Sequence, residues 1–238
     1  MKNVIIIGAS SGIGRALALR LLKSNCKVFI TGRRKVLLEE VQHEFPDHCF
    51  VKSFDIDEEV KIKEHFDDMV RVLGTVDLII ANAGYGEVNK NLVWESERGI
   101  IQTNVLGIAR IYQLAYTLFV KQGHGHLVGI SSIAAIRGNR HAPAYSATKA
   151  FQANYLEGLR ANFKHLKKPI YVTDIQPGFV KTKMARGHGL FWVAALDTAA
   201  DQIIKAIDRK KSVAFITKRW RLIAWLMKWL PRWVYDKI

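Results

Sequence analysis

The chain has 238 residues, of which 36 are lysine or arginine and 21 are aspartate or glutamate, so its formal net charge is +15. With 49% hydrophobic and 24% charged residues, its composition is that of a globular protein and excludes a disordered one. The length suffices for one sizeable α/β domain. The two cysteines, Cys26 and Cys49, are too few for a disulfide framework or a structural zinc site, so no metal site is expected.

The apolar run at residues 4–7 is too short for a signal-peptide core or a membrane span. It predicts a buried strand, and we expect a cytoplasmic protein. The positive net charge favours an anionic partner, such as nucleotide phosphate, acidic lipid or nucleic acid. No nucleic-acid recognition motif accompanies the charge, so we expect no nucleic-acid partner.

Short apolar segments alternate with longer helical patterns along almost the whole chain. Strands are predicted at residues 3–7, 27–31, 49–54, 76–81, 126–131, 170–175 and 213–217. Helices are predicted at residues 13–24, 34–44, 58–73, 97–122, 145–166 and 198–208. The alternation predicts a doubly wound α/β fold with a mostly parallel seven-stranded sheet and helices on both faces. One domain is expected over residues 1–217, followed by a basic, tryptophan-rich helical tail at 218–238.

A glycine-rich turn, GASSGIG, follows the first predicted strand. The residues expected around a pyrophosphate there are Gly8, Ser10, Ser11, Gly12, Ile13 and Gly14. Glycines let the backbone approach phosphate closely, and the helix that follows directs unpaired N–H groups towards it. An ordinary strand-to-helix turn is the alternative, but the position directly after an apolar strand favours a dinucleotide site.

Two arginines, Arg33 and Arg34, follow the second predicted strand. An acid at this place usually holds the ribose 2′-hydroxyl of NAD, whereas a cation accommodates the 2′-phosphate of NADP. The guanidinium groups therefore favour NADP(H) over NAD(H), although a solvated basic helix start would give the same sequence.

The third and fourth predicted strands also end in residues suited to a cofactor. After the third strand, Asp55 and Ile56 could hold an adenine. After the fourth strand come Asn82, Ala83 and Gly84, whose small side chains would let the backbone pass close to a ligand. Ligands of doubly wound sheets bind at the carboxyl ends of the strands, so we expect all these turns at one edge.

Tyr145 and Lys149 lie four residues apart in a predicted helix and therefore share one face. A neighbouring ammonium stabilises a phenolate, so such a pair can exchange a proton near neutral pH. Taken alone, the pair could equally be a chance feature of an amphipathic helix.

Six motifs occur in order along the chain: GASSGIG, NAG, NVLG, SS, YSATK and PGFVKT. With this set the chain resembles the short-chain dehydrogenase/reductase family in its single-domain form, and only the tail lies outside the resemblance. The resemblance implies a Rossmann-like fold and the transfer of a hydride between a nicotinamide cofactor and a substrate carbon.

The resemblance also implies roles for the matching residues. Tyr145 would be the acid/base, Lys149 would hold the nicotinamide ribose and lower the pKa of Tyr145, and Ser132 would orient the substrate carbonyl. Asn104 would hold a water that links Lys149 to bulk solvent. On the nicotinamide side the matching residues are Pro177, Gly178, Val180 and Thr182, of which Thr182 and the Val180 backbone would fix the carboxamide. A homodimer through helices 97–122 and 145–166 is expected, because the tail lacks the ending of tetrameric relatives.

The segment 183–194 is expected to lie over the substrate. Its apolar side chains favour a lipophilic ketone, aldehyde or secondary alcohol, although they could instead close the core; they include Met184, Leu190, Phe191 and Trp192. The favoured function is thus an NADP(H)-dependent carbonyl reductase or alcohol dehydrogenase. The alternative is a non-catalytic nucleotide-binding module, against which the full set of implied catalytic residues argues.

Four of the six tryptophans lie between residues 220 and 233. At helical spacing Arg221 and Lys228 share one stripe, and Arg232 lies close to it if the helix continues through Pro231. Such a helix is too short to span a bilayer but fits the interface of an anionic membrane, on its cytoplasmic face. It could instead pack on its own domain, roof the substrate pocket or join a dimer.

Overall fold

The computed structural model describes residues 2–182 and 191–236. In these ranges seven strands form one sheet in the order β3-β2-β1-β4-β5-β6-β7, and every neighbouring pair is parallel. The strands are β1 Asn3–Ile7, β2 Lys27–Gly32, β3 Cys49–Ser53, β4 Leu78–Ala81, β5 Gly125–Ile130, β6 Ile170–Pro177 and β7 Val213–Ile216. The predicted doubly wound sheet is confirmed, and its described strands are parallel throughout.

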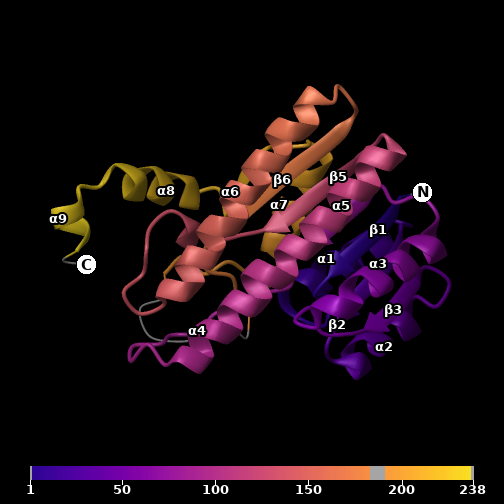
Figure 1. Ribbon diagram of the computed structural model, residues 1–238, viewed down its shortest axis with the longest axis horizontal. Helices are drawn as coiled ribbons and strands as arrows, with labels where there is room; N and C mark the ends of the chain where they lie inside the picture. Colours follow the sequence, from indigo (N-terminus) through magenta and orange to yellow (C-terminus); the bar gives the residue numbers. More distant parts are fainter. Residues whose placement is uncertain (1, 183–190, 237–238) are drawn as a thin grey trace.

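Helices cover both faces of this sheet (Figure 1). Side chains of α1, α2 and α7 join one buried cluster, and those of α3, α5 and α6 join the other. The bounds are α1 Gly12–Lys23, α2 Lys35–Glu44, α3 Glu59–Leu73, α4 Trp94–Ile101, α5 Ile108–Gln122, α6 Pro143–His165, α7 Leu196–Asp208, α8 Trp220–Trp229 and α9 Arg232–Tyr235.

The central strand β1 explains why the core has two halves. Consecutive side chains of a strand point to opposite faces. Val4 and Ile6 therefore enter the cluster of α1, α2 and α7, while Ile5 and Ile7 enter that of α3, α5 and α6. A strand buried on both faces has to be apolar at successive positions, which is why the sequence shows unbroken apolar runs.

The prediction of one helix over residues 97–122 is wrong. The chain there forms α4, then a π-helical segment, η1 Gln102–Gly107, and then α5. Asn104 lies within η1, and its buried side chain bonds to the backbone of Tyr85 and to Thr148 on α6. Such tertiary bonds favour a wider turn that the local helical pattern does not reveal, and π-turns are frequent at functional sites.

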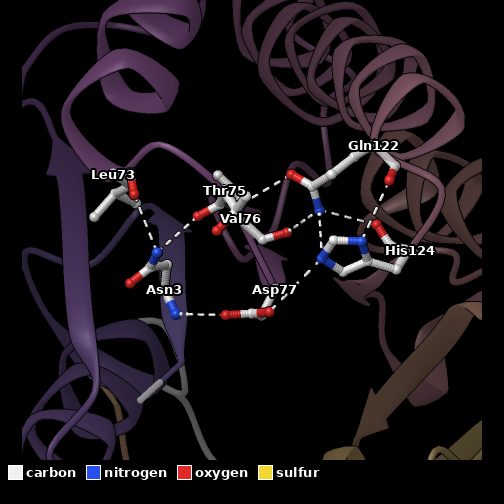
Figure 2. A network of polar contacts seen from close by, with 7 residues as sticks. All are labelled: Asn3, Leu73, Thr75, Val76, Asp77, Gln122 and His124. Atoms are coloured by element: carbon white, nitrogen blue, oxygen red, sulfur yellow. Dashed lines mark hydrogen bonds and ion pairs between the residues drawn. The ribbon is translucent and has the colours of Figure 1, made fainter.

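Hydrogen bonds join β1 to the segment that leads into β4, at the edge where the strands begin (Figure 2). The backbone N–H of Asn3 donates to Asp77 Oδ2 at 2.8 Å. The Asn3 side-chain amide donates to the carbonyl oxygens of Leu73 and Thr75, at 3.0 and 2.8 Å. These bonds lie at the opposite edge of the sheet from the turns in which a cofactor site was expected.

Pro231 separates α8 from α9. Helix α8 ends before Leu230, whose extended backbone prevents further helical turns, so Arg232 belongs to α9 and not to the stripe of Arg221 and Lys228. Figure 1 shows α8 and α9 extending as an arm away from the sheet. None of the helices in the described ranges is long and apolar enough to cross a membrane.

The Gln122 side chain joins the end of α5 to the start of β4 and supplies a stability test. Its Oε1 accepts from the backbone N–H of Val76 at 3.0 Å, and its Nε2 donates to the Val76 carbonyl at 2.9 Å (Figure 2). Because Val76 is fully buried, Gln122→Ala leaves its N–H unpaired and should cost about 1–3 kcal/mol of unfolding free energy.

Urea denaturation measures this cost. The control is Gln113→Ala on the exposed side of the same helix, which should change stability by no more than about 0.5 kcal/mol. Equal effects of the two substitutions would show that the bonds of Gln122 contribute nothing specific.

Candidate active site

The turn after β1 forms a cradle in which Gly8 and Gly14 have no room for a side chain. Gly8 and Gly12 have φ values of +88° and +58°, in a region that other residues rarely adopt. A Cβ at Gly14 would lie 2.2 Å from the carbonyl oxygen of Gly8. Helix α1 begins at Gly12 with no side-chain cap from Ser11 and no acid in its first turn. Its N–H groups are thus available to an anion, which fits the pyrophosphate of a dinucleotide.

Both arginines after β2 lie next to this cradle. The guanidinium of Arg34 donates to Ser10 Oγ at 2.9 Å and to Ser11 Oγ at 2.6 Å. Arg33 is also exposed, and its Nη1 lies 3.4 Å from Asp55 Oδ2. Of the two predicted phosphate ligands, Arg34 therefore contacts the glycine turn, and Arg33 pairs with Asp55, which partly balances its charge.

The end of β4 approaches the cradle from its other side. Asn82 donates from Nδ2 to the Gly8 carbonyl at 2.5 Å, and a Cβ at Gly8 would lie 2.6 Å from the Cα of Ala83. Beyond it, a Cβ at Gly84 would lie 2.8 Å from Asn104 Oδ1. The NAG motif thus connects the glycine turn to the second group of predicted site residues. Ile56 is buried farther along the same edge, in the turn after β3.

Tyr145 lies in the first turn of α6 and is half-buried. Its side chain lies beside Ser132, just after β5, and Lys149 Nζ lies 5.9 Å from its ring centroid. Burial raises the pKa of Tyr145, and the neighbouring Ser132 hydroxyl opposes that rise. The lowering of this pKa expected from Lys149 is therefore not found in this structure. The neighbouring Ser131 instead donates to Asp174 on β6, which favours Ser132 as the serine of the site.

Lys149 is buried beneath the tyrosine. Its ammonium donates to the Ile130 carbonyl at 2.9 Å and to Gln152 Oε1 at 3.0 Å. Burial lowers the pKa of Lys149 to about 8, and the nearby carboxylate of Asp174 opposes this. The lysine is therefore mostly charged at neutral pH. Because this pKa is close to neutral pH, a change in the surroundings of the lysine can alter its charge.

Gln152 is a residue that the sequence analysis missed. Its Nε2 donates to the backbone carbonyl of Asn104 at 2.8 Å, while its Oε1 accepts from Lys149. The Gln152 amide thus bridges Asn104 and Lys149, the two residues that the resemblance places on a proton path to bulk solvent. The one available signal was spacing, because Gln152 follows Lys149 by three residues and so shares its helix face.

The segment after β6 completes the edge. Pro177 ends β6, and Gly178 donates from its N–H to the Ile216 carbonyl at 2.6 Å. Val180 is buried and pairs with Ala194 in a parallel bridge. The γ-methyl of Thr182 lies 3.6 Å from where a Cβ of Gly12 would be, so this segment reaches the glycine cradle.

Phe191 and Trp192 pack beside this segment. Their ring centroids lie 5.1 and 6.1 Å from that of Trp220, and they remain 48% and 40% exposed. The other two residues predicted to cover the substrate, Met184 and Leu190, lie outside the described residues.

Comparisons with known proteins show the family and the fold. The pattern of the short chain dehydrogenase family matches residues 2–189. An uncharacterized oxidoreductase of Myxococcus xanthus is 38% identical over 189 residues, which cover 77% of this chain and 74% of that protein. The NADP-dependent 3-hydroxy acid dehydrogenase of Escherichia coli is 28% identical over 180 residues, covering 74% and 72%. A short-chain dehydrogenase structure from Streptomyces avermitilis superposes with a TM-score of 0.84 at 24% identity, covering 95% and 91%.

The bond from Lys149 to Gln152 predicts an effect on the charge of the lysine. Gln152→Leu removes an acceptor that stabilises the ammonium and should lower the pKa of Lys149 by about one unit. Gln152→Glu adds a negative charge and should raise it. NMR titration of 13C-labelled lysine measures the pKa, with Lys149→Met identifying the resonance.

Shifts of the Lys149 pKa in opposite directions in these two variants would show that Gln152 positions the lysine charge and does not merely pack against it. The control is Gln202→Leu on α7, far from Lys149 in the sequence and on the other face of the sheet. An unchanged Lys149 titration in both Gln152 variants would contradict the assignment.

Proposed function

The chain belongs to the short-chain dehydrogenase/reductase family of oxidoreductases, and we propose that it is an NADP(H)-dependent carbonyl reductase or alcohol dehydrogenase. The observation that carries the proposal is the grouping of Ser132, Tyr145 and Lys149 beside a glycine cradle that fits a pyrophosphate. The bound cofactor would supply a hydride to the substrate carbon or take one from it.

Tyr145 would handle the proton. Since burial raises the pKa of its hydroxyl, the tyrosine is protonated at neutral pH and can act as an acid. In reduction it donates this proton to the carbonyl oxygen while the carbonyl carbon receives the hydride, and an alcohol results. Ser132, which lies beside Tyr145, would donate to the same oxygen and fix its position. In oxidation the phenolate takes the proton back.

Lys149 would support both the cofactor and the phenolate. An ammonium has three N–H donors, and Ile130 and Gln152 receive two of them. The third could reach a hydroxyl of the nicotinamide ribose. The positive charge would also stabilise the tyrosinate left after proton transfer.

The substrate is proposed to be a lipophilic carbonyl compound or alcohol. Phe179, Phe191 and Trp192 cluster around Trp220 beside the segment that would hold the nicotinamide. Apolar walls with a few polar groups are typical of small-molecule sites. The relative from Escherichia coli acts on 3-hydroxy acids, so a substrate panel should include 3-oxo acids beside long-chain aldehydes and ring ketones.

Removing the phenol tests the reaction. Tyr145→Phe should lower kcat by at least about two orders of magnitude while leaving NADPH binding nearly unchanged, because the hydroxyl is the proton donor. NADPH consumption with the carbonyl panel gives kcat, and calorimetry gives the Kd of NADPH. The control is Tyr155→Phe on the same helix, whose ring packs on Tyr112 and Phe151.

Each outcome of this experiment has a clear meaning. Retention of more than about a tenth of the wild-type kcat in Tyr145→Phe would refute the role of the tyrosine. NADPH binding without turnover of any carbonyl compound or alcohol would instead support the non-catalytic nucleotide-binding module.

The preference for NADP(H) rests on the charges beside the cradle. Arg33 and Arg34 follow β2, and no acid stands at the end of that strand to accept a ribose 2′-hydroxyl. Arg34 already binds the Ser10 and Ser11 hydroxyls that border the cradle. A guanidinium held there could donate to a 2′-phosphate, and the NADP-dependent relative supports this preference.

Cofactor binding should therefore depend on these two arginines. Arg33→Ala combined with Arg34→Ala should raise the Kd of NADPH by at least about tenfold more than that of NADH. The control is Lys35→Ala, which removes a neighbouring cation that pairs with Glu39 instead. Equal affinity of the unaltered protein for both cofactors would already contradict the preference.

A further inference from the structure

Helix α8 has apolar side chains on two opposite sides, but only one of these sides touches the rest of the molecule. Trp220 and Ala224 are buried on that side, and Ile223 and Met227 are half-buried. Trp220 lies against Gly178, where a Cβ would come within 2.1 Å of its Cε2. The first turn of the helix is therefore anchored at the end of β6.

The opposite side of α8 is uncovered. Leu222, Trp225, Leu226 and Trp229 face outward there and are between 50% and 69% exposed. Two leucines and two tryptophans on ten helical residues form a large apolar face, and large exposed patches usually mark an interaction site.

Cations flank this outward face. Arg221 and Lys228 lie seven residues apart, two helical turns, on one border of the face, and both are exposed. No salt bridge between described residues engages either of them. Residues 218–236 contain five lysines and arginines and one acid, Asp236. The apolar face thus lies in a strongly positive segment.

The arm is held to the body at a few points and leaves the outward face open. Arg137 donates to the carbonyl oxygens of Met227 and Leu230, and the Tyr235 hydroxyl donates to the Gly138 carbonyl at 2.7 Å. A cavity of about 680 Å³ lies between Tyr235, the chain around residues 135–141 and the start of α6. These contacts fix the arm from its inner side only.

A second group of exposed apolar side chains lies by the buried first turn of α8. Phe191, Trp192 and Val193 are 48%, 40% and 39% exposed, and the rings of Phe191 and Trp192 contact Trp220. The guanidinium of Arg219 lies 5.2 Å from the Trp192 ring, so a cation lies beside this group too.

We propose that the outward face of α8 docks on an anionic lipid bilayer. An amphipathic segment with aromatic side chains flanked by lysine and arginine is the chemistry that binds such an interface. A symmetric contact with a second copy would bring the cations of both arms together, and their repulsion disfavours that occupant. The proposal does not depend on which carbonyl compound the protein uses.

Co-sedimentation of the full chain with vesicles tests this docking. Vesicles of phosphatidylcholine with about 30 mol% phosphatidylserine should bind the protein, and pure phosphatidylcholine should not. Raising the salt from about 50 mM to about 500 mM should weaken binding at least about tenfold, because headgroup attraction is screened.

Two pairs of matched variants locate the docking surface. Leu226→Glu with Trp229→Glu should lower binding at least about tenfold, whereas Val60→Glu with Val72→Glu, the same charge change at exposed valines of α3, should not. Arg221→Glu with Lys228→Glu should also lower it about tenfold, unlike Lys27→Glu with Lys211→Glu, which lie at the opposite edge of the sheet.

Folding and self-association are measured on the same samples. Thermal melting and NADPH affinity should match the unaltered protein in all four variants, since none of the substituted side chains is buried or lies in the cofactor site. The proposal is overturned if phosphatidylserine vesicles bind no protein at low salt, or if the α8 variants bind as well as their controls. It is also overturned if Leu226→Glu with Trp229→Glu only converts a dimer to a monomer in sedimentation velocity.

Discussion

The candidate site depends on the buried amide of Asn104. Its Oδ1 accepts from the Tyr85 N–H at 3.0 Å, and its Nδ2 donates to the Tyr85 carbonyl at 2.8 Å and to Thr148 Oγ1 at 3.1 Å. Its backbone carbonyl receives the Gln152 amide. One residue thereby ties the segment after β4 to two positions on α6, and a buried amide without these partners would be costly. The mutual positions of Tyr145, Lys149 and the NAG turn follow from this connection.

The sequence could predict the sheet and the places of the motifs, but not the contacts between distant segments. Strands buried on both faces show as apolar runs, so the parallel sheet was predictable from residues such as Val4, Ile5 and Ile6. The motifs end strands, and strand ends of a parallel sheet meet at one edge. The π-helical segment and the bridging by Gln152 were not predictable in this way, because both depend on partners more than forty residues away in the chain.

The charge of Lys149 illustrates the limit for electrostatics. Its spacing from Tyr145 is readable in the sequence, but its burial and its acceptors on Ile130 and Gln152 are not. The nearness of Asp174, a buried carboxylate on β6, is not readable either. Burial raises the pKa of Asp174, and hydrogen bonds from Gln176 and Ser131 oppose that rise. Opposing effects of this kind decide the pKa of an internal group, and they come from chain segments that only the fold brings together.

Trp220 connects the arm of α8 and α9 to the candidate site. Its ring lies on Gly178, in the turn that would hold the nicotinamide, and contacts Phe179 and Phe191 beside the substrate region. Any side chain at Gly178 would displace this ring, so the glycine serves the anchoring of α8 as well as the turn itself. Because the anchor of the arm and the wall of the site share these rings, movement of one has to be accommodated by the other. A lipid surface bound to the outward face of α8 would therefore act on a helix whose buried anchor is part of the wall of the candidate site.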